Sequence, residues 1–375
     1  MRYLKLTTFI ATIILCNSLY AQSKHSCSSF QLSSGDTVVV GHNLDEYFTV
    51  PGMVVVNPRN IKKENISWYD LRKGKKKNQP SVQWTSKYGS ITYNTFGREF
   101  IDGGINEAGL YVGEMTLMET EYYTDIAKPT FYHCFWMQYL LDNYASVNEV
   151  IENLSTVCID GHSRWHFFIA DKTGDVATIE FIKGKPIIHR GENLPHNILC
   201  NSAYSNDLDS LKLYKGYGGE RIIDINDKEN TKRTVRATEL IRIFNESKPK
   251  PIVDYSFDML SSLNLGNNQW QIVCDLTNQK MYFKTVLCNK IKYTSIKEFN
   301  FDSKNQLYID IHSNLENDIT NNFLPLTATT NKKYVRKTWW AIDFGFFGNI
   351  FFKPFVVFFM GAKMSDYTSE FYLNE

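Results

Sequence analysis

The chain has 375 residues, which is enough for one large domain or two. Its 41 Lys and Arg nearly balance its 40 Asp and Glu, so there is no general basic surface that would indicate nucleic-acid binding. Aromatic residues make up 14% of the chain. This content excludes a disordered protein and suits packed β-structure.

The N-terminus has the organisation of an export signal. A basic start (MRYLK) precedes an apolar run over residues 6–15, and Ala21 is a small residue suited to cleavage. We therefore expect residues 1–21 to be a signal peptide and the protein to be secreted or periplasmic. A buried N-terminal helix is the alternative, but the polar residues 22–26 continue no helical pattern.

The cysteine spacing excludes a zinc site and draws attention to one thiol. Seven cysteines stand at positions 16, 27, 134, 158, 200, 274 and 288, with no CxxC or Cys/His ligand spacing among them, so no metal is expected. Cys27 lies just beyond the predicted signal. It is either half of a disulfide or the first residue of the mature chain. In the second case its free amine, with a pKa near ~8, would act as a base for a thiol near ~8.5.

Strand patterns dominate the chain from Cys27 onward. Gly35 and Asp36 separate two apolar runs, which predicts a β-hairpin over residues 27–45. Further strands are predicted at 53–58, 90–97, 109–117, 164–182, 185–190, 197–204, 270–285 and 293–301. Helices are predicted at 130–144, at 146–154 with a Ser146/Glu149 capping box, and at 234–247. Strands and helices without regular βαβ alternation indicate antiparallel sheets with helices packed outside.

Two stretches differ from the rest of the chain. The basic tract RKGKKKNQP at residues 72–80 is interpreted as a solvated loop, because no aromatic residue interleaves with the lysines as nucleic-acid stacking would require. The tail at residues 319–375 is rich in aromatics, but Asp343, Lys353 and Pro354 interrupt it before the ~20 residues of a spanning helix are reached. Core strands or an interface patch are predicted there, in preference to a membrane anchor.

Three motifs stand in a fixed order after Cys27: GHNLD at 41–45, GGINEAGL at 103–110 and ILCNSAY at 198–204. Each alone fits an ordinary turn or a buried amide. Together with QWTSKYGSITYN, WHFFIADKTGDVATIEF, KRTVR and WQIVCDLTNQKMYF, they resemble the choloylglycine hydrolase family, which includes penicillin V acylases and conjugated bile salt hydrolases. The resemblance runs from Cys27 to about Phe301. The same segments resemble the acid-ceramidase-like amidases more weakly.

The resemblance implies an N-terminal-nucleophile hydrolase of the α+β class, with a four-layer αββα sandwich of two antiparallel sheets. It places the hydrolase domain at residues 27–318, with residues 319–375 as an extension packed on it. Residues 22–26 would then be a short propeptide, removed by self-catalysed cleavage so that Cys27 becomes the first residue. Family members often form tetramers, so a homo-oligomer is implied, although the sequence itself does not test it.

The same resemblance assigns the catalytic residues. Cys27 matches the nucleophile, Asp45 the aspartate that orients it, and Asn201 a side chain of the oxyanion hole. Arg233 matches a basic residue that supports the site. Thr116 stands where bile salt hydrolases have an asparagine whose backbone N–H completes the oxyanion hole. Threonine has the same backbone N–H, so this donor is kept.

His42 departs from the family pattern, which has arginine at this position. Histidine is shorter and is charged only part of the time near neutral pH, whereas arginine is a permanent cation. If His42 acts, it donates to Cys27 or to the substrate, and activity falls as the pH rises past its pKa. The alternative is that His42 is only a polar packing residue.

The implied reaction is cleavage of a linear C–N amide bond through a thioester, with no cofactor. Phe48, Met53, Met115 and Leu117 are candidates for an apolar acyl pocket, although each could equally be core. The substrate is a small N-acyl amide whose identity, bile salt, penicillin or other, the sequence does not give. An acyltransferase using the same thioester and a non-catalytic envelope protein on a decayed scaffold are the alternatives.

Overall fold

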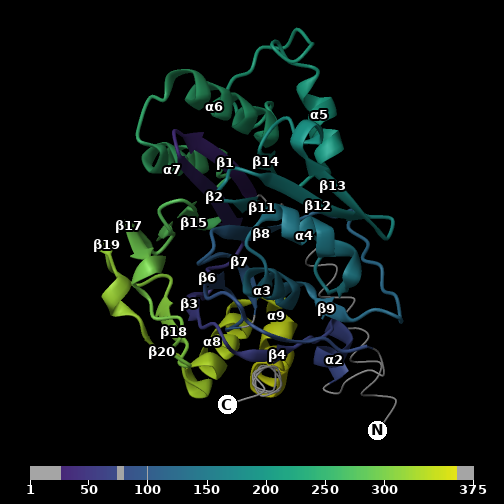
Figure 1. The fold of residues 1–375 in the computed structure, drawn as a ribbon, viewed down its shortest axis with the longest axis vertical. Helices are drawn as coiled ribbons and strands as arrows, with labels where there is room; N and C mark the ends of the chain where they lie inside the picture. The colour runs from purple at the N-terminus through teal and green to yellow at the C-terminus, as the bar shows by residue number, and fades with distance from the viewer. Residues whose placement is uncertain (1–26, 74–79, 99, 361–375) are drawn as a thin grey trace.

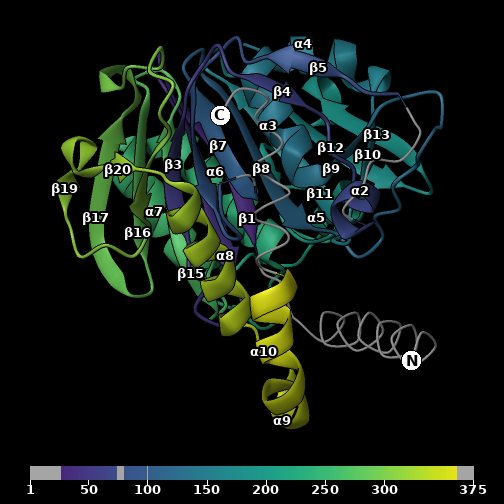
Figure 2. The same ribbon diagram turned by 90° about the horizontal axis from the view of Figure 1, so that it is seen from below.

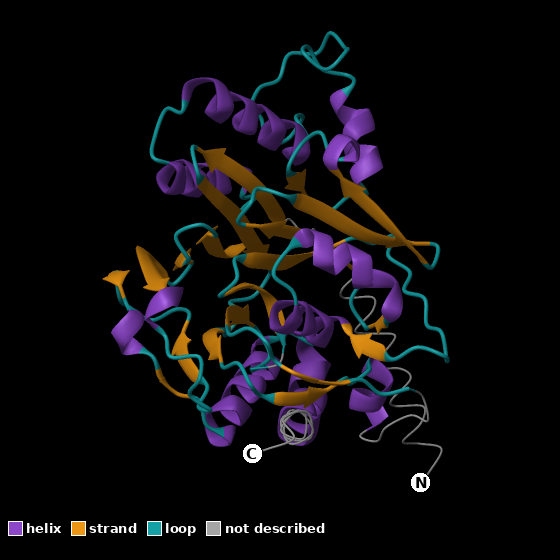
Figure 3. Cartoon of the chain, viewed as in Figure 1, coloured by secondary structure: helices purple, strands orange, loops and turns teal. Residues whose placement is uncertain are grey.

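The computed structural model describes residues 27–73, 80–98 and 100–360 (Figure 1). The predicted signal and propeptide at 1–26, and the centre of the basic tract at 74–79, lie outside the described residues. Two large, mainly antiparallel sheets lie face to face between helices on either side (Figure 3). The predicted α+β class and the four-layer αββα arrangement are confirmed.

The first sheet has seven strands and contains the predicted N-terminal hairpin. In spatial order they are β14 (Ile198–Leu199), β1 (Ser28–Ser34), β2 (Thr37–Asp45), β15 (Asn268–Asp275), β16 (Lys280–Thr285), β17 (Cys288–Ser295) and β19 (Asn317–Asp318). Gly35 turns the hairpin with a φ of 57°, a conformation that glycine adopts without steric cost. The register pairs Ser28 with Asn43, which brings the start of β1 beside the end of β2.

The second sheet has nine strands. In spatial order they are β13 (Lys185–Arg190), β12 (Val176–Ile182), β11 (Trp165–Asp171), β8 (Leu110–Thr116), β7 (Ile101–Asn106), β6 (Ser90–Asn94), β3 (Met53–Asn57), β18 (Leu307–Asp310) and β20 (Leu324–Pro325). The strand β7 was not predicted, because two glycines, Gly103 and Gly104, lie inside it and weaken the strand pattern, while the turn between β7 and β8 falls at residues 107–109. A side chain at Gly103 would collide with the hydroxyl of Tyr93, its partner on the neighbouring strand β6, so the position of the Tyr93 ring requires glycine there.

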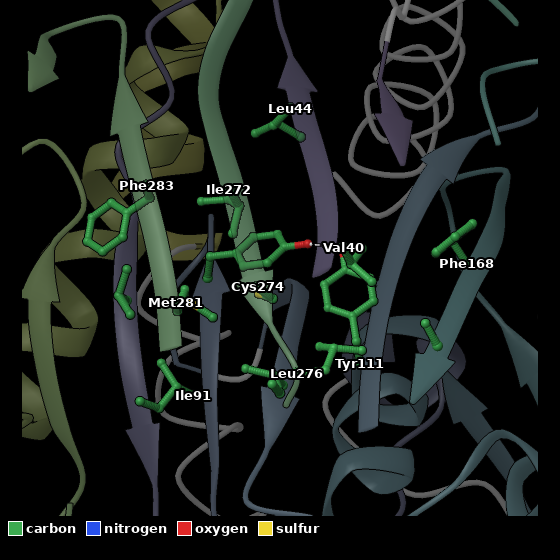
Figure 4. Packing of buried hydrophobic residues seen from close by; sticks show 14 of the residues in the cluster. Val40, Leu44, Ile91, Tyr111, Phe168, Ile272, Cys274, Leu276, Met281 and Phe283 are labelled. Carbon is green, nitrogen blue, oxygen red and sulfur yellow. Dashed lines mark hydrogen bonds between the residues drawn. The ribbon is translucent and has the colours of Figure 1, made fainter. Parts of the chain in front are cut away.

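Three apolar layers follow from the alternation of side chains along the strands. Between the sheets lies a core that includes Val40, Leu44, Tyr111 and Ile272 (Figure 4). On the outer face of the first sheet, residues such as Phe30 and Val39 pack under α6 (Arg233–Ser247) and α7 (Ile252–Leu263). On the outer face of the second sheet, residues such as Val112 and Phe167 pack under α3 (His133–Asn143) and α4 (Val147–Asn153).

The predicted helices are confirmed, and others were missed. Ser146 caps α4 by accepting from the Glu149 N–H, while the Glu149 carboxylate accepts from the Ala145 N–H. Only two residues of the strand predicted at 197–204 pair in the sheet. Unpredicted elements are α2 (Trp68–Lys73), α5 (Tyr204–Leu211), α7, and the small strands β4 (Lys62–Glu64), β5 (Gln83–Thr85), β9 (Thr130–Tyr132) and β10 (Cys158–Asp160).

From Ala328 to Met360 the described part of the aromatic tail is mainly helical, so the prediction of core strands is wrong for this stretch. It forms α8 (Ala328–Ala341), then α9 (Gly345–Phe347) and α10 (Lys353–Phe355), joined and continued by wider turns at Gly348–Phe352 and Val356–Met360. The preference of aromatic residues for strands depends on packing against neighbouring strands and against other side chains on the same face of a sheet. Here β20 already pairs with β18, and α8 covers the outer face beside β3 through Tyr334, Met53 and Val55. None of the helices in the described part of the chain is both long and apolar enough to cross a bilayer.

Candidate active site

Cys27 lies immediately before β1 and is 3% exposed, among the inter-sheet core residues. Burial, together with the nearby carboxyl groups of Glu114, Asp45 and Glu46, raises the pKa of its thiol well above the usual range, and a hydrogen bond from the Asp45 backbone opposes this only in part. The thiol is therefore protonated in the resting state. All six cysteines of the described residues are free, so Cys27 does not form a disulfide with any of them.

Asp45 ends β2, and the hairpin register brings it beside Cys27. Its carboxylate accepts a hydrogen bond of 2.8 Å from the Asn268 side chain, which reaches it from the start of β15. Asp45 is 2% exposed. This buried carboxylate is one of the charges that raise the pKa of the Cys27 thiol.

Asn201, Arg233 and Thr116 form a single hydrogen-bonded chain. The Arg233 Nη2 donates to the Asn201 Oδ1 at 2.6 Å, and the Asn201 Nδ2 donates to the Thr116 carbonyl at 2.9 Å. Because arginine can only donate, it fixes which end of the amide is oxygen and which is nitrogen. The second N–H of Asn201 is then a donor whose orientation is set in advance.

The Thr116 N–H points away from β11. Thr116 faces Trp165 in the β8–β11 pair, and the next residue, Leu117, donates its N–H to the Arg164 carbonyl at 2.8 Å. In an antiparallel ladder this makes Thr116 and Trp165 a pair without mutual backbone hydrogen bonds, so each N–H points outward. The structure thus places the predicted backbone donor and the Asn201 amide beside one another.

His42 is a neutral residue of the inter-sheet core. It is 0% exposed, and burial lowers its pKa to about 3. Its Nδ1 lies 2.8 Å from the Ser29 Oγ, and its ring lies 5.4 Å from that of Tyr93. The expectation that His42 is charged part of the time near neutral pH is therefore wrong, because a charge at this depth would have no solvation. A role of His42 as a neutral hydrogen-bonding group stays a prediction.

The predicted acyl-pocket residues separate into two groups. Met115 belongs to the same inter-sheet core as Cys27, and Phe48 packs against that core from the loop after β2. Leu117 is fully buried just beyond β8. Met53 instead faces the outer side of the second sheet, where it packs with Tyr334 of α8. The structure thus removes Met53 from the predicted pocket.

A surface groove of about 830 Å³ lies elsewhere, between α6 and the far end of β1. Its lining includes Gln31, Tyr217 and Arg242, but none of the predicted catalytic residues. The groove is therefore separate from the candidate site at Cys27.

Comparison with known proteins decides the family. The family model described as "Linear amide C-N hydrolases, choloylglycine hydrolase family" matches residues 27–243. The chain belongs to this family. The match begins at Cys27, the residue to which the motifs assign the nucleophile.

Individual relatives agree with the family. A penicillin V acylase from Pectobacterium atrosepticum is 26% identical over 274 residues, which cover 62% of this chain and 72% of that protein. The solved penicillin V acylase from Agrobacterium tumefaciens superposes with a TM-score of 0.68 at 21% identity, over 80% of this chain and 98% of that one. A mutant of the conjugated bile acid hydrolase from Clostridium perfringens superposes with a TM-score of 0.61 at 18% identity, over 78% of this chain and 98% of that one. The two structures support the fold.

Sequence reasoning missed three interacting carboxyl groups in this choloylglycine hydrolase family member, two of which, Glu46 and Glu114, help to raise the pKa of the Cys27 thiol. Glu46 follows Asp45, while Asp102 and Glu114 are 4% exposed on the neighbouring strands β7 and β8. Burial, with mutual repulsion among the three, raises the pKa of both Asp102 and Glu114. No motif signals them, because their closeness depends on how the strand ends of the two sheets meet.

Sequence reasoning also missed His166 and Glu180, which contact the residues on either side of Asn201. The His166 Nε2 donates to the carbonyl of Cys200 at 2.7 Å, and its Nδ1 lies 3.3 Å from the Glu180 carboxylate. Both ring nitrogens face acceptors, so the imidazole ring is held from two sides. Glu180 also receives the Tyr204 N–H at 2.8 Å and lies 3.3 Å from the His189 Nε2. These contacts hold the strand end that carries Asn201.

Replacing Glu180 with glutamine is expected to weaken the fold at moderate pH and to flatten its acid dependence. Burial alone would raise the Glu180 pKa, but hydrogen bonds from His166 and His189 lower it from 4.5 to about 2. A lowered carboxyl pKa stabilises the folded state above the unfolded pKa, and this is lost as the pH falls toward 2, by roughly 3 kcal/mol. Urea unfolding between pH 5 and pH 2.5 measures it. Exposed Glu192→Gln is the control, and an unchanged slope in Glu180→Gln would contradict the assignment.

Glu46 is expected to act in the opposite direction. Burial, reinforced by Asp45 and opposed by the Tyr47 N–H, raises the Glu46 pKa from 4.5 to about 7. The folded state then keeps this proton where the unfolded state loses it, so its contribution to stability is lost as the pH rises from about 4.5 to about 7. In Glu46→Gln, the free energy of unfolding should therefore fall less than in the wild type as the pH rises from about 4.5 to about 7. A variant with the wild-type slope over this range would show that Glu46 ionises normally.

Proposed function

We propose that this chain is an exported cysteine amidohydrolase that cleaves the C–N bond of linear N-acyl amides through a thioester on Cys27. One observation carries the proposal. A buried free thiol next to a carboxylate lies at the strand end, in a chain whose family match begins at that thiol. The Arg233–Asn201–Thr116 chain supplies the oriented donor that such chemistry requires.

The steps follow from the residue types. The Cys27 sulfur attacks the amide carbonyl while its proton passes to the α-amine of the same residue, which must be free. The C–S bond forms, and the resulting oxyanion accepts hydrogen bonds from the Asn201 Nδ2 and the Thr116 N–H. The α-ammonium returns the proton to the leaving nitrogen as the C–N bond breaks. Water then cleaves the thioester and releases the acyl group as a carboxylic acid.

The raised pKa of Cys27 fits a concerted transfer rather than a preformed thiolate. Burial and three nearby carboxyl groups make the resting thiolate costly, so the sulfur has to lose its proton during attack. The carboxylate of Asp45 would stabilise the α-ammonium that forms. Because His42 is neutral, it supplies no charge to this step.

Export and processing belong to the same proposal. Residues 1–21 have the basic and apolar regions of a signal peptide, and Ser26–Cys27 is the bond whose cleavage frees the amine. The Cys27 thiol is the group we assign to that cleavage. Cleavage after Ala21 alone would leave residues 22–26 attached and the nitrogen acylated.

The test combines intact mass with thioester trapping. Purified protein is expected to have a mass that begins at Cys27, and acid quenching during turnover of an N-acyl p-nitroanilide should add the acyl mass to the Cys27 peptide. A panel of acyl chains then measures the preferred substrate. A turning-over protein that retains residues 22–26 would overturn the mechanism. Acyl transfer to added amines in preference to water would favour the acyltransferase alternative.

A further inference from the structure

The C-terminal helices expose an unusual concentration of aromatic side chains. We call residues 340–358 the aromatic arm. It presents Trp340, Phe346, Ile350, Phe351, Phe355 and Phe358, which are 54%, 74%, 51%, 76%, 55% and 58% exposed. Among the side chains whose exposure the structure describes, every exposed Phe and Trp belongs to this arm. Figure 2 shows α9 and α10 projecting beyond the body of the molecule.

The arm is a folded hairpin on α8. The Asp343 Oδ1 accepts from the Gly345 N–H at 2.9 Å and from the Asn349 Nδ2 at 2.6 Å, which fixes the turn. Val356 and Val357 are 4% exposed, in the wide turn that packs against α8. The side chains of the arm therefore divide into a buried face and an exposed aromatic face, as in an amphipathic helix.

α8 fastens this hairpin to the sheets. The Thr338 Oγ1 donates to the Thr95 carbonyl at 2.7 Å, and the Tyr334 hydroxyl donates to the Asp310 carboxylate at 2.7 Å. Tyr334 also packs with Met53 and Val55 on the outer face of the second sheet. The exposed aromatic face is thus presented from a fixed base.

Along the chain, the charges of α8 and the arm have one dominant sign. Residues 328–358 contain five cations, and Asp343 is the single acid. The cations are Lys332, Lys333, Arg336, Lys337 and Lys353. Of these cations, Lys337 lies 3.8 Å from the Asp310 carboxylate. Lys353 lies 5.3 Å from the centre of the Trp340 ring, and Arg336 lies 5.6 Å from that of Phe358, so cations and aromatic rings share one surface.

The geometry points to the aromatic arm as a docking surface for an anionic lipid bilayer. Phenylalanine and tryptophan side chains gain free energy on entering the interface between headgroups and acyl chains, and nearby lysines are attracted to anionic headgroups. A second copy of the chain fits less well. A symmetric contact would bring two sets of five cations together, and like charges oppose such an interface.

The test is flotation of the purified full chain with vesicles. Vesicles of phosphatidylcholine with about 30% phosphatidylglycerol are compared with phosphatidylcholine alone, at about 50 mM and about 500 mM NaCl. Binding is expected to the anionic vesicles, with weakening at high salt. The Trp340 emission should shift to shorter wavelength on binding, and this shift should be lost in Trp340→Phe.

Matched variants locate the surface. The triple variant Phe346→Ser, Phe351→Ser, Phe355→Ser is expected to bind at least about tenfold more weakly. The control triple Ile222→Ser, Leu265→Ser, Leu287→Ser removes apolar residues that are 82%, 45% and 64% exposed elsewhere, and should bind like the wild type. All variants keep the same N-terminus, so a difference reports the arm. Circular dichroism verifies that each variant is folded.

Two results would overturn the proposal. If the wild type and the triple variant of the arm bind vesicles equally, or if neither binds, the aromatic arm is not the lipid contact. A wild type that fails to bind vesicles but forms a dimer in light scattering, which the arm triple converts to a monomer, would show that a second copy covers this surface.

Discussion

Replacing Cys27 with alanine is expected to abolish amide hydrolysis, with kcat lowered by about 10⁴-fold or more. No other described cysteine lies at a strand end beside Asp45. Cys200, whose Sγ lies 3.8 Å from the Ser28 Oγ, belongs to the apolar layer under α6 and α7 and not to the core that contains Cys27. Release of the amine from a chromogenic N-acyl amide measures the loss. Cys27→Ser replaces the thiol with a weaker hydroxyl nucleophile in both the processing step and turnover, so it is expected to retain at most a small part of the activity.

Cys274→Ala is the matched control for this prediction. Cys274 is a free thiol, 0% exposed, in the same inter-sheet core as Cys27, and burial raises its pKa as well. This variant should lose stability through the small cavity that it creates but keep its kcat. If Cys27→Ala turns over substrate at the wild-type rate, the nucleophile is another group.

The parts of the fold that could be predicted are those encoded locally. The β1–β2 hairpin follows from two apolar runs around Gly35 and Asp36, and α4 follows from its Ser146 cap. The assignment of Asn201 rested on a motif, and the structure adds its orientation by Arg233. Arg233 and Asn201 are more than 30 residues apart in the chain, so no local sequence pattern predicts their contact.

The parts that could not be predicted depend on which surface a segment meets. The aromatic segment at residues 328–360 has strand propensity, but α8 packs on the outer face of the second sheet and the segment folds as helices. Met53 and Val54 are adjacent, and only the pleat decides that Met53 faces α8 while Val54 faces the inter-sheet core. His42 was expected to be charged in part, whereas its strand places it between the sheets, where burial keeps it neutral.

Asn201→Ala is expected to lower kcat by about 10²–10³-fold, which corresponds to about 2.7–4 kcal/mol in the barrier. KM should change much less, because the lost hydrogen bond forms mainly with the oxyanion of the transition state. Steady-state kinetics with one N-acyl amide separates the two parameters. Asn197→Ala is the matched control, since Asn197 is a nearby amide that bonds the Gln31 side chain instead.

The hydrogen bond between Arg233 and Asn201 allows the role of the Asn201 amide to be tested with a double variant. Arg233→Ala should lower kcat by a smaller factor than Asn201→Ala, because the amide stays in place but is free to rotate. In the double variant, the loss should equal that of Asn201→Ala alone, since Arg233 acts through the Asn201 amide oxygen. Losses that multiply in the double variant would show that Arg233 acts on the substrate directly. Equal kcat for Asn201→Ala and the wild type would mean that the backbone N–H of Thr116 holds the oxyanion without the Asn201 amide.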